Sequence, residues 1–200
     1  GSGAFADVYQ AHDSALARTV ALKVLKPTLV ADNNALARFI REAQVISNLF
    51  HANIATVLDT GSEQGRYFIA MRYVEGVSLD KVIAQHKGLK WAEALQVIKH
   101  IAAALDFAHA RGLIHRDVKP QNIIVSKTEG AVLTDFGLAK AVLGSGSNLT
   151  QTGALLGTPY YIPPEIWSGK EATPATDQYA LACVLGEMLS GKVLFPGDTP

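Results

Sequence analysis

The hydrophobic pattern of the chain changes after Gly76, and this change is the sequence feature that most restricts the possible folds of the chain. Before Gly76 the apolar residues fall in short runs rich in β-branched and aromatic side chains, which are typical of strands. After Gly76 they recur with a helical period over longer stretches. We therefore expect an α+β chain with a small antiparallel β part that carries one helix, followed by a larger and mostly helical part.

The same patterns place the individual elements. Strands are expected at Phe5–Ala11, Val20–Leu25, Ile54–Leu58, Arg66–Tyr73, Ile123–Val125 and Val132–Thr134, with a turn over Gly61–Gly65 that joins the third and fourth into a hairpin. Helices are expected at Asn33–Phe50, Ser78–Gln85, Trp91–Ala110 and Pro174–Leu189, and a loop rich in Gly, Ser and Thr at 143–158.

Composition excludes several classes of protein. The chain has 200 residues, 48% of them hydrophobic and 18% charged, which is a globular composition, and its net charge is zero. A neutral chain gives no support for nucleic acid or an anionic membrane as a partner. Cys183 is the only cysteine, so no internal disulfide can form and a reducing compartment is favoured. We expect a cytoplasmic segment without membrane contact, because the longest apolar run, Tyr179–Met188, is too short to span a bilayer.

The strongest chemical pattern is H-R-D-V-K-P-Q-N at 115–122, followed by D-F-G at 135–137. V-A-L-K stands at 20–23, P-P-E at 163–165, and Asp177 opens the last expected helix. In this order and on these elements, the motifs resemble those of protein kinases, in particular the bacterial serine/threonine protein kinases. The resemblance covers essentially the whole chain. It implies a bilobal kinase fold, with the smaller lobe at 1–73, the hinge and larger lobe at 74–200, and an activation segment at 135–165.

The resemblance implies a role for each polar residue of these motifs. Asp117 would accept the proton of the substrate hydroxyl, and Lys119 would steady the γ-phosphate of ATP. Asn122 and Asp135 would supply oxygen ligands to Mg²⁺, with Mn²⁺ as an alternative. Lys23 would bind the α- and β-phosphates. Five of the six residues three, four or seven positions from Glu42 are apolar, so Glu42 is expected to face inward and to need a cation. That cation is Lys23, or else Arg38 or Arg41 through a local pair.

The remaining expected contacts concern the nucleotide. The first residues read G-S-G-A-F-A. The resemblance implies that they are the tip of a phosphate-covering loop, in which Gly1 and Gly3 would let the backbone approach the phosphates and Ala6 replaces the third glycine. The alternative for Gly1–Gly3 is a linker. Met71 would border the adenine, with the backbone of Arg72 and Val74 binding the base. Val8, Ala21 and Ile124 would sandwich the purine ring, or serve only in core packing.

Regulation and partners follow from the same resemblance. Thr150 and Thr152 resemble the threonine pair that bacterial members phosphorylate on themselves. One copy of a homodimer would then phosphorylate the other. A phosphate on either threonine would pair with Arg116. Thr158 would dock a protein substrate. His115 is expected to be a packed structural histidine. Two other functions stay open: a pseudokinase scaffold, and a small-molecule phosphotransferase. Because family members carry a first strand and further helices, we expect a domain that is cut at both ends and is poorly stable or inactive alone.

Overall fold

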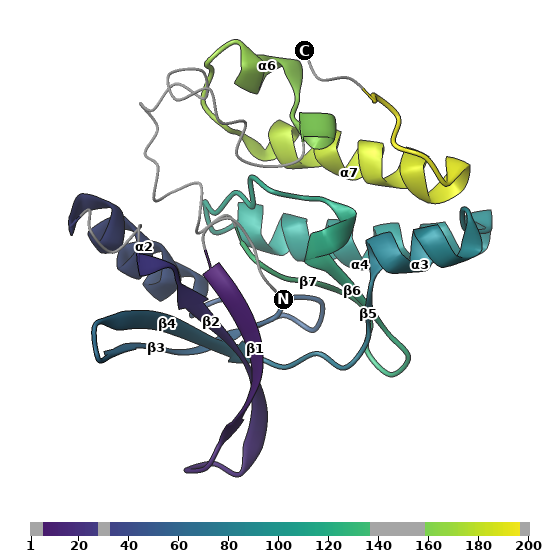
Figure 1. Cartoon of the computed structure of the whole chain (residues 1–200). Helices are drawn as coiled ribbons and strands as arrows, with labels where there is room; N and C mark the ends of the chain where they lie inside the picture. The colour runs from purple at the N-terminus through teal and green to yellow at the C-terminus, as the bar shows by residue number, and fades with distance from the viewer. Residues whose placement is uncertain (1–5, 28–32, 137–158, 197–200) are drawn as a thin grey trace. The chain divides into compact units, whose positions relative to one another are not determined.

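A computed structural model describes residues 6–27, 33–136 and 159–196 (Figure 1). Within residues 33–42 it describes the backbone but only some of the side chains. The described residues form two compact units. One holds the described residues up to His51 together with Ala55–Val74, and the other holds Ala52–Ile54 and the described residues from Glu75 onward. The α+β class expected from the hydrophobic pattern is confirmed.

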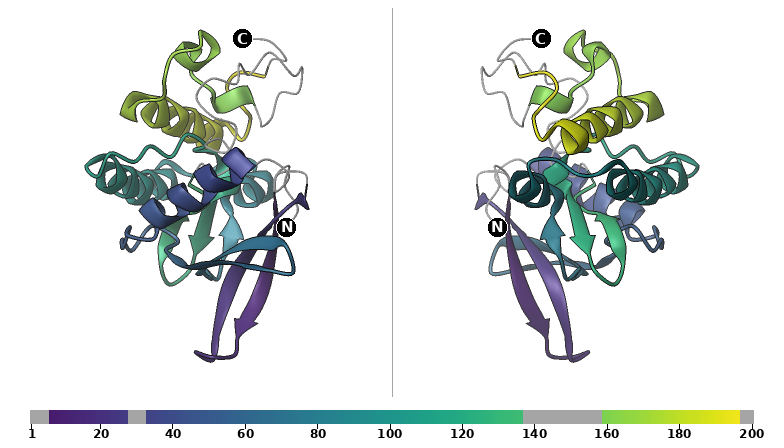
Figure 2. Two further views of the ribbon diagram at one scale, coloured as in Figure 1. Left: turned by 90° about the vertical axis from the view of Figure 1, so that its left-hand side faces the viewer. Right: turned by 90° about the vertical axis from the view of Figure 1, so that its right-hand side faces the viewer.

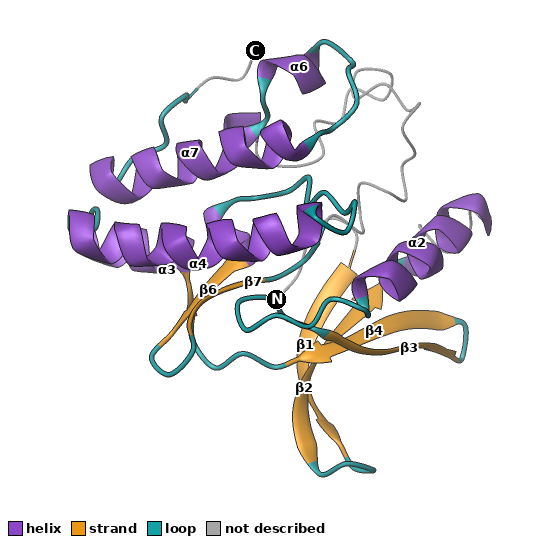
Figure 3. Ribbon diagram, turned by 180° about the vertical axis from the view of Figure 1, so that it is seen from behind, coloured by secondary structure: helices purple, strands orange, loops and turns teal. Residues whose placement is uncertain are grey.

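The first unit is an antiparallel sheet with one helix. Its strands are β1 (Ala6–Asp13), β2 (Arg18–Leu25), β3 (Val57–Glu63) and β4 (Arg66–Arg72), in the order β1-β2-β4-β3. Helix α2 (Asn33–Ile46) packs against β3 (Figure 3). The buried apolar residues Val20, Leu25, Ala43, Ile46, Leu49, Val57, Ile69 and Met71 form the core of this unit.

The turn of the β3–β4 hairpin differs from the sequence prediction. Gly61 and Ser62 belong to β3, and the turn lies at Gln64–Gly65, where both residues have positive φ. A pair of residues in this conformation is the geometry that two-residue hairpins prefer. Gly61 is instead paired with Phe68, and a Cβ at residue 61 would lie 2.7 Å from Cζ of that ring. The glycine therefore serves close packing inside a strand rather than chain reversal.

Helix α2 ends four residues earlier than its apolar period predicts. The hydroxyl of Ser47 and the amide of Asn48 both donate to the main-chain oxygen of Gln44, at 2.8 and 3.1 Å. The following main-chain bonds, from Asn48 to Val45 and from Leu49 to Ile46, have three-residue spacing. Polar side chains that compete for helical carbonyls end a helix in this way, although Leu49 still packs in the core.

The second unit contains a small sheet covered by helices. Strands β5 (Val77–Ser78), β6 (Ile123–Ser126) and β7 (Gly130–Leu133) are antiparallel in that order. Helix α4 (Trp91–His109) packs against β7 on one side and against α7 (Pro174–Ser190) on the other (Figure 2). The other elements are α3 (Leu79–His86), α6 (Pro164–Trp167) and the short 3₁₀ turns η1 (Pro120–Asn122) and η2 (Pro159–Tyr161).

The segment 52–54 joins this second unit through β7. The main-chain N–H of Leu133 donates to the oxygen of Asn53 at 2.8 Å, and the Asn53 side chain donates to the oxygen of Ala131 at 2.8 Å. The strand expected at Ile54–Leu58 is therefore wrong at its start, because residues 52–54 pair with β7 and β3 begins at Val57. Among the described helices, none combines the length and the apolar character needed to cross a membrane.

Candidate active site

The loop between α4 and β6 brings three of the predicted polar residues together. The ammonium group of Lys119 lies 2.7 Å from Oδ2 of Asp117. The side-chain amide of Asn122 donates to the same oxygen at 2.9 Å and to the main-chain oxygen of Asp117 at 2.8 Å. Asn122 is buried at the end of η1. One cation and one amide thus fix the Asp117 carboxylate in an orientation suited to accept a proton.

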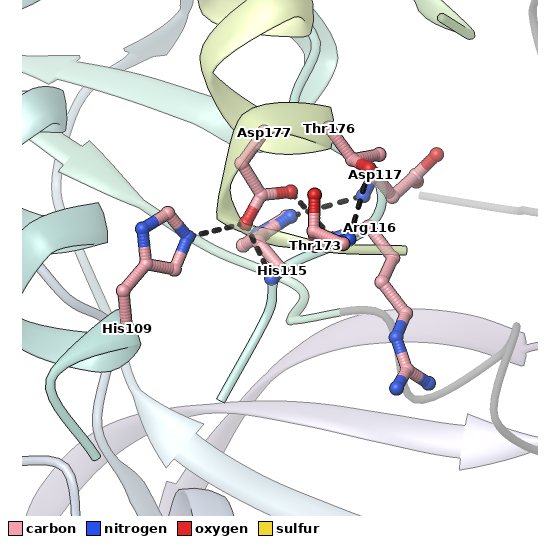
Figure 4. Close-up of polar contacts among 7 residues, drawn as sticks. All are labelled: His109, His115, Arg116, Asp117, Thr173, Thr176 and Asp177. Carbon is pink, nitrogen blue, oxygen red and sulfur yellow. Dashed lines mark hydrogen bonds and ion pairs between the residues drawn. The ribbon is translucent and has the colours of Figure 1, made fainter. Parts of the chain in front are cut away.

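Asp177 holds the backbone of this loop, as Figure 4 shows. Its carboxylate accepts the main-chain N–H of His115 and that of Arg116, both at 2.8 Å, and Nε2 of His109 lies 2.8 Å from its Oδ2. Asp177 is 1% exposed and lies in the first turn of α7. Arg116 has φ of +65°, a conformation that is costly for a residue with a side chain. The buried carboxylate therefore keeps two consecutive amides of a strained loop in place.

His115 is fully buried, as the sequence analysis expects of a packed histidine. Its Nε2 lies 2.9 Å from the main-chain oxygen of Thr134, and its Nδ1 accepts the main-chain N–H of Asp117 at 3.2 Å. A carbonyl oxygen only accepts, so Nε2 carries the proton and the ring is neutral. Burial lowers the pKa of His115, which favours this neutral form. Its ring also packs on Phe136, with centroids 4.6 Å apart.

The two candidate metal ligands are linked through Thr134. The main-chain N–H and the hydroxyl of Thr134 both donate to the main-chain oxygen of Asn122, at 2.8 and 3.1 Å. Asp135 follows directly and has φ of +56°. An amide and a carboxylate are hard oxygen donors that fit Mg²⁺, which needs few protein ligands because it keeps waters and substrate phosphates. Within the described ranges, no three His, Cys, Asp or Glu side chains group as a metal site.

Four predicted nucleotide contacts share one face of the first unit's sheet. Lys23 of β2 is paired with Val8 of β1, and Ala21 of β2 is paired with Met71 of β4. Directly paired residues, and residues two apart on one strand, point to the same face. Val8, Ala21, Lys23 and Met71 therefore lie on that face together.

Arg72 lies on the opposite face, because it is paired with Val20. Its main-chain N–H donates to the oxygen of Thr56 at 2.9 Å. That N–H is already used inside the first unit, so a contact of the base with the Arg72 main chain would have to be made by its carbonyl. Ile124, the last predicted purine contact, stands in β6 opposite Val132 and Ser78.

Several predicted residues lie outside the described part of the chain. They are Gly1 and Gly3 of the expected phosphate loop, and Thr150, Thr152 and Thr158 of the expected activation segment. Glu42 belongs to α2, but its side chain is not among those described. Its pairing with Lys23, or with Arg38 or Arg41, stays a prediction.

Two polar contacts of the second unit were missed by the sequence reasoning. The hydroxyl of Tyr161 donates to Oε2 of Glu187 at 2.5 Å, and both residues are buried. Burial and the Glu187 carboxylate raise the pKa of Tyr161, so its hydroxyl stays protonated. This bond ties η2 to α7. A carboxylate inside the apolar run Tyr179–Met188 is the sequence signal that predicts such a contact. The second missed contact is the one between His109 and Asp177, and no sequence signal at the end of α4 predicts it.

An α+β fold in which Asp117 and Asn122 of an H-R-D-x-x-x-x-N loop are hydrogen-bonded together, with D-F-G following, is typical of protein kinase domains. The sequence profile described as "Protein kinase domain" matches residues 1–200, and the chain belongs to this family. It is 42% identical over its full length to the probable serine/threonine-protein kinase PknB of Lactococcus lactis, and 43% identical to the serine/threonine-protein kinase PknD of Mycobacterium tuberculosis. The chain spans 32% and 30% of the lengths of these relatives.

A solved structure agrees with the family assignment. The kinase domain of Mycobacterium tuberculosis PknI superposes with a TM-score of 0.79 at 34% identity, over 98% of this chain and 73% of that one. The predicted bacterial serine/threonine kinase resemblance is thereby confirmed as to family and fold.

Proposed function

We propose that this domain transfers the γ-phosphate of ATP to serine or threonine hydroxyls of proteins. The observation that carries the proposal is the Asp117 carboxylate, held by Lys119 at 2.7 Å and by Asn122 at 2.9 Å. Phosphoryl transfer depends on positioning and charge neutralisation more than on covalent chemistry. A fixed carboxylate beside a fixed ammonium group supplies both, because the first receives a proton and the second meets a phosphate.

The described residues divide the work as follows. Asp117 accepts the proton of the attacking hydroxyl, which keeps the nucleophile aligned with the γ-phosphorus. Lys119 offsets the negative charge that spreads over the transferred group. Asp177 acts through the backbone at His115 and Arg116, since it fixes the loop rather than touching the substrate.

The nucleotide and the metal are assigned to two sets of residues. Asn122 and Asp135 would hold Mg²⁺, which when bound neutralises the phosphates of ATP. Lys23 would meet the α- and β-phosphates with Glu42 as its partner. Val8, Ala21, Met71 and Ile124 would surround the purine, with the main chain of Val74 and the carbonyl of Arg72 at its polar edge.

We further propose that the domain phosphorylates itself at Thr150 and Thr152, within a second copy of the chain. A phosphate there has about two negative charges and would pair with Arg116, next to the catalytic aspartate in sequence. Protein substrates would dock at Thr158. Support comes from the family membership and from relatives that are named serine/threonine kinases.

The test is phosphate transfer from labelled ATP with Mg²⁺ in the full-length protein, with Asp117→Asn beside it. The unaltered protein should incorporate label, with mass spectrometry placing it at Thr150 and Thr152. Asp117→Asn should lose about 10²- to 10⁴-fold in rate, the usual share of a general base. Equal rates from both proteins would contradict the role of Asp117. Nucleotide binding without transfer from either would favour a pseudokinase.

A further inference from the structure

Gly76 occupies a position where a side chain cannot be placed. A Cβ at residue 76 would lie 2.4 Å from the main-chain oxygen of Val125 and 2.8 Å from Cγ2 of Ile124. Both distances are well inside van der Waals contact. The main chain of Gly76 therefore lies directly against β6, at the residue proposed to contact the purine and at its neighbour.

The β6 side of this contact cannot move to make room. Immediately after Gly76, strand β5 pairs with β6 through Val77 opposite Val125 and Ser78 opposite Ile124. On its other edge β6 is paired with β7 along its whole length. The neighbouring residues Ile123 and Val132 are both fully buried. Any strain at residue 76 would therefore displace residue 76 and the chain before it.

We propose that Gly76 is a positioning residue for the nucleotide, one that seats the chain entering β5 against Ile124 and so sets the binding of the adenine ring. This inference rests on the proposed kinase function. Val74, whose main chain is assigned to the base, precedes Gly76 by two residues. A side chain at 76 would shift this segment away from Ile124. The phosphate contacts, at Lys23 and Lys119, stand on other elements and would be kept.

This division predicts a particular pattern for Gly76→Ala. Adenosine and ATP should both bind about tenfold more weakly, the effect expected from the loss of about one hydrogen bond. The factor should be the same for both ligands, because only the adenine end is affected. KM for ATP should rise by that factor, while kcat at saturating ATP is retained.

Gly191→Ala is the matched control. A Cβ at residue 191 would also lie 2.4 Å from a main-chain oxygen, that of Lys87, and the contact joins α7 to the α3–α4 loop. If Gly76 were only a packing glycine, neither variant would weaken adenosine. We expect both to lower the melting temperature, and only Gly76→Ala to weaken adenosine.

Calorimetric titration of the full-length protein with adenosine and with ATP decides between these outcomes. Unchanged affinity in folded Gly76→Ala overturns the proposal, and so does a loss for ATP that adenosine does not share. If Gly76→Ala does not fold, hydrogen exchange in the unaltered protein replaces it: adenosine should slow exchange at residues 74–78, and no protection there overturns the proposal. Failure of the unaltered protein to bind ATP would instead refute the proposed kinase function, and the inference with it.

Discussion

The carboxylate of Asp177 accepts the main-chain N–H of Arg116 at 2.8 Å, although 61 positions separate the two residues in the sequence. The same carboxylate accepts the N–H of His115 and contacts His109. Because Arg116 has a positive φ, the loop would relax toward a commoner conformation if this anchor were removed. The first turn of α7 therefore fixes the backbone of the loop that carries Asp117 and Lys119.

Asp177→Asn should destabilise the fold and slow catalysis together. An asparagine side chain has one accepting oxygen in place of two, so at least one of the three groups that contact the carboxylate loses its partner. We expect the free energy of unfolding to fall by about 2–4 kcal/mol, measured by urea denaturation. Asp106→Asn, an exposed position on α4, is the control and should change little. Equal stability of the two variants would contradict the anchoring role.

The hydrophobic pattern was sufficient to predict most elements, because long apolar periods such as that of α4 depend on local sequence alone. It failed where pairing between strands decides the outcome. Gly61 is a turn residue by composition, yet it is paired with Phe68 inside β3, where a side chain would meet the Phe68 ring. Strand β5 has two residues, too few for any periodicity to be detected.

The candidate site likewise combines contacts that local sequence predicts with contacts that it does not. Asp117, Lys119 and Asn122 are neighbours in the sequence, so their motif by itself predicts that they share one loop. The anchors His109 and Tyr161 contact partners 68 and 26 positions away. No local pattern specifies those pairings, since each depends on how α7 packs against the rest of its unit.

Lys119→Gln should lower kcat far more than it changes nucleotide binding. The 2.7 Å pair with Asp117 holds the ammonium group beside the proposed base, and under the proposed function it would meet the charge that develops on the transferred phosphate. Loss of such a preorganised charge costs about 10²- to 10³-fold in kcat. Lys127→Gln, the same change at an exposed lysine between β6 and β7, should leave the rate unchanged. Steady-state kinetics measure both, and a Lys119→Gln variant with normal kcat would contradict the assigned role.

Acid should destabilise the fold through His115. Burial lowers its pKa below the ordinary 6.5, so the unfolded chain binds this proton more tightly than the folded one. The stability that the neutral ring provides is therefore present above about pH 6.5 and is lost as pH falls toward the lower folded-state pKa, by up to about 1.4 kcal/mol per pH unit.

Urea denaturation at about pH 7.5 and about pH 5.5 measures this loss. His115→Gln removes the titrating ring, so the difference in unfolding free energy between the two pH values should shrink. His12→Gln, at an exposed histidine of β1, should leave that difference unchanged. An undiminished pH effect in His115→Gln would assign the acid sensitivity to other groups.

Gly191 and Gly112 allow the free-energy cost of backbone strain to be measured apart from the cost of a steric clash. Both have φ near +70°, but a Cβ at 191 would lie 2.4 Å from the main-chain oxygen of Lys87, whereas nothing lies within 4 Å of one at 112. Gly112→Ala should therefore lower the free energy of unfolding only by the backbone strain, about 1 kcal/mol.

Gly191→Ala adds a clash with main chain that is held in place, because the N–H of Leu89 donates to the oxygen of Met188 at 2.6 Å close to the clash. We expect a total loss of about 3 kcal/mol in urea denaturation. Equal losses for the two variants would mean that the α3–α4 loop yields to the new methyl group.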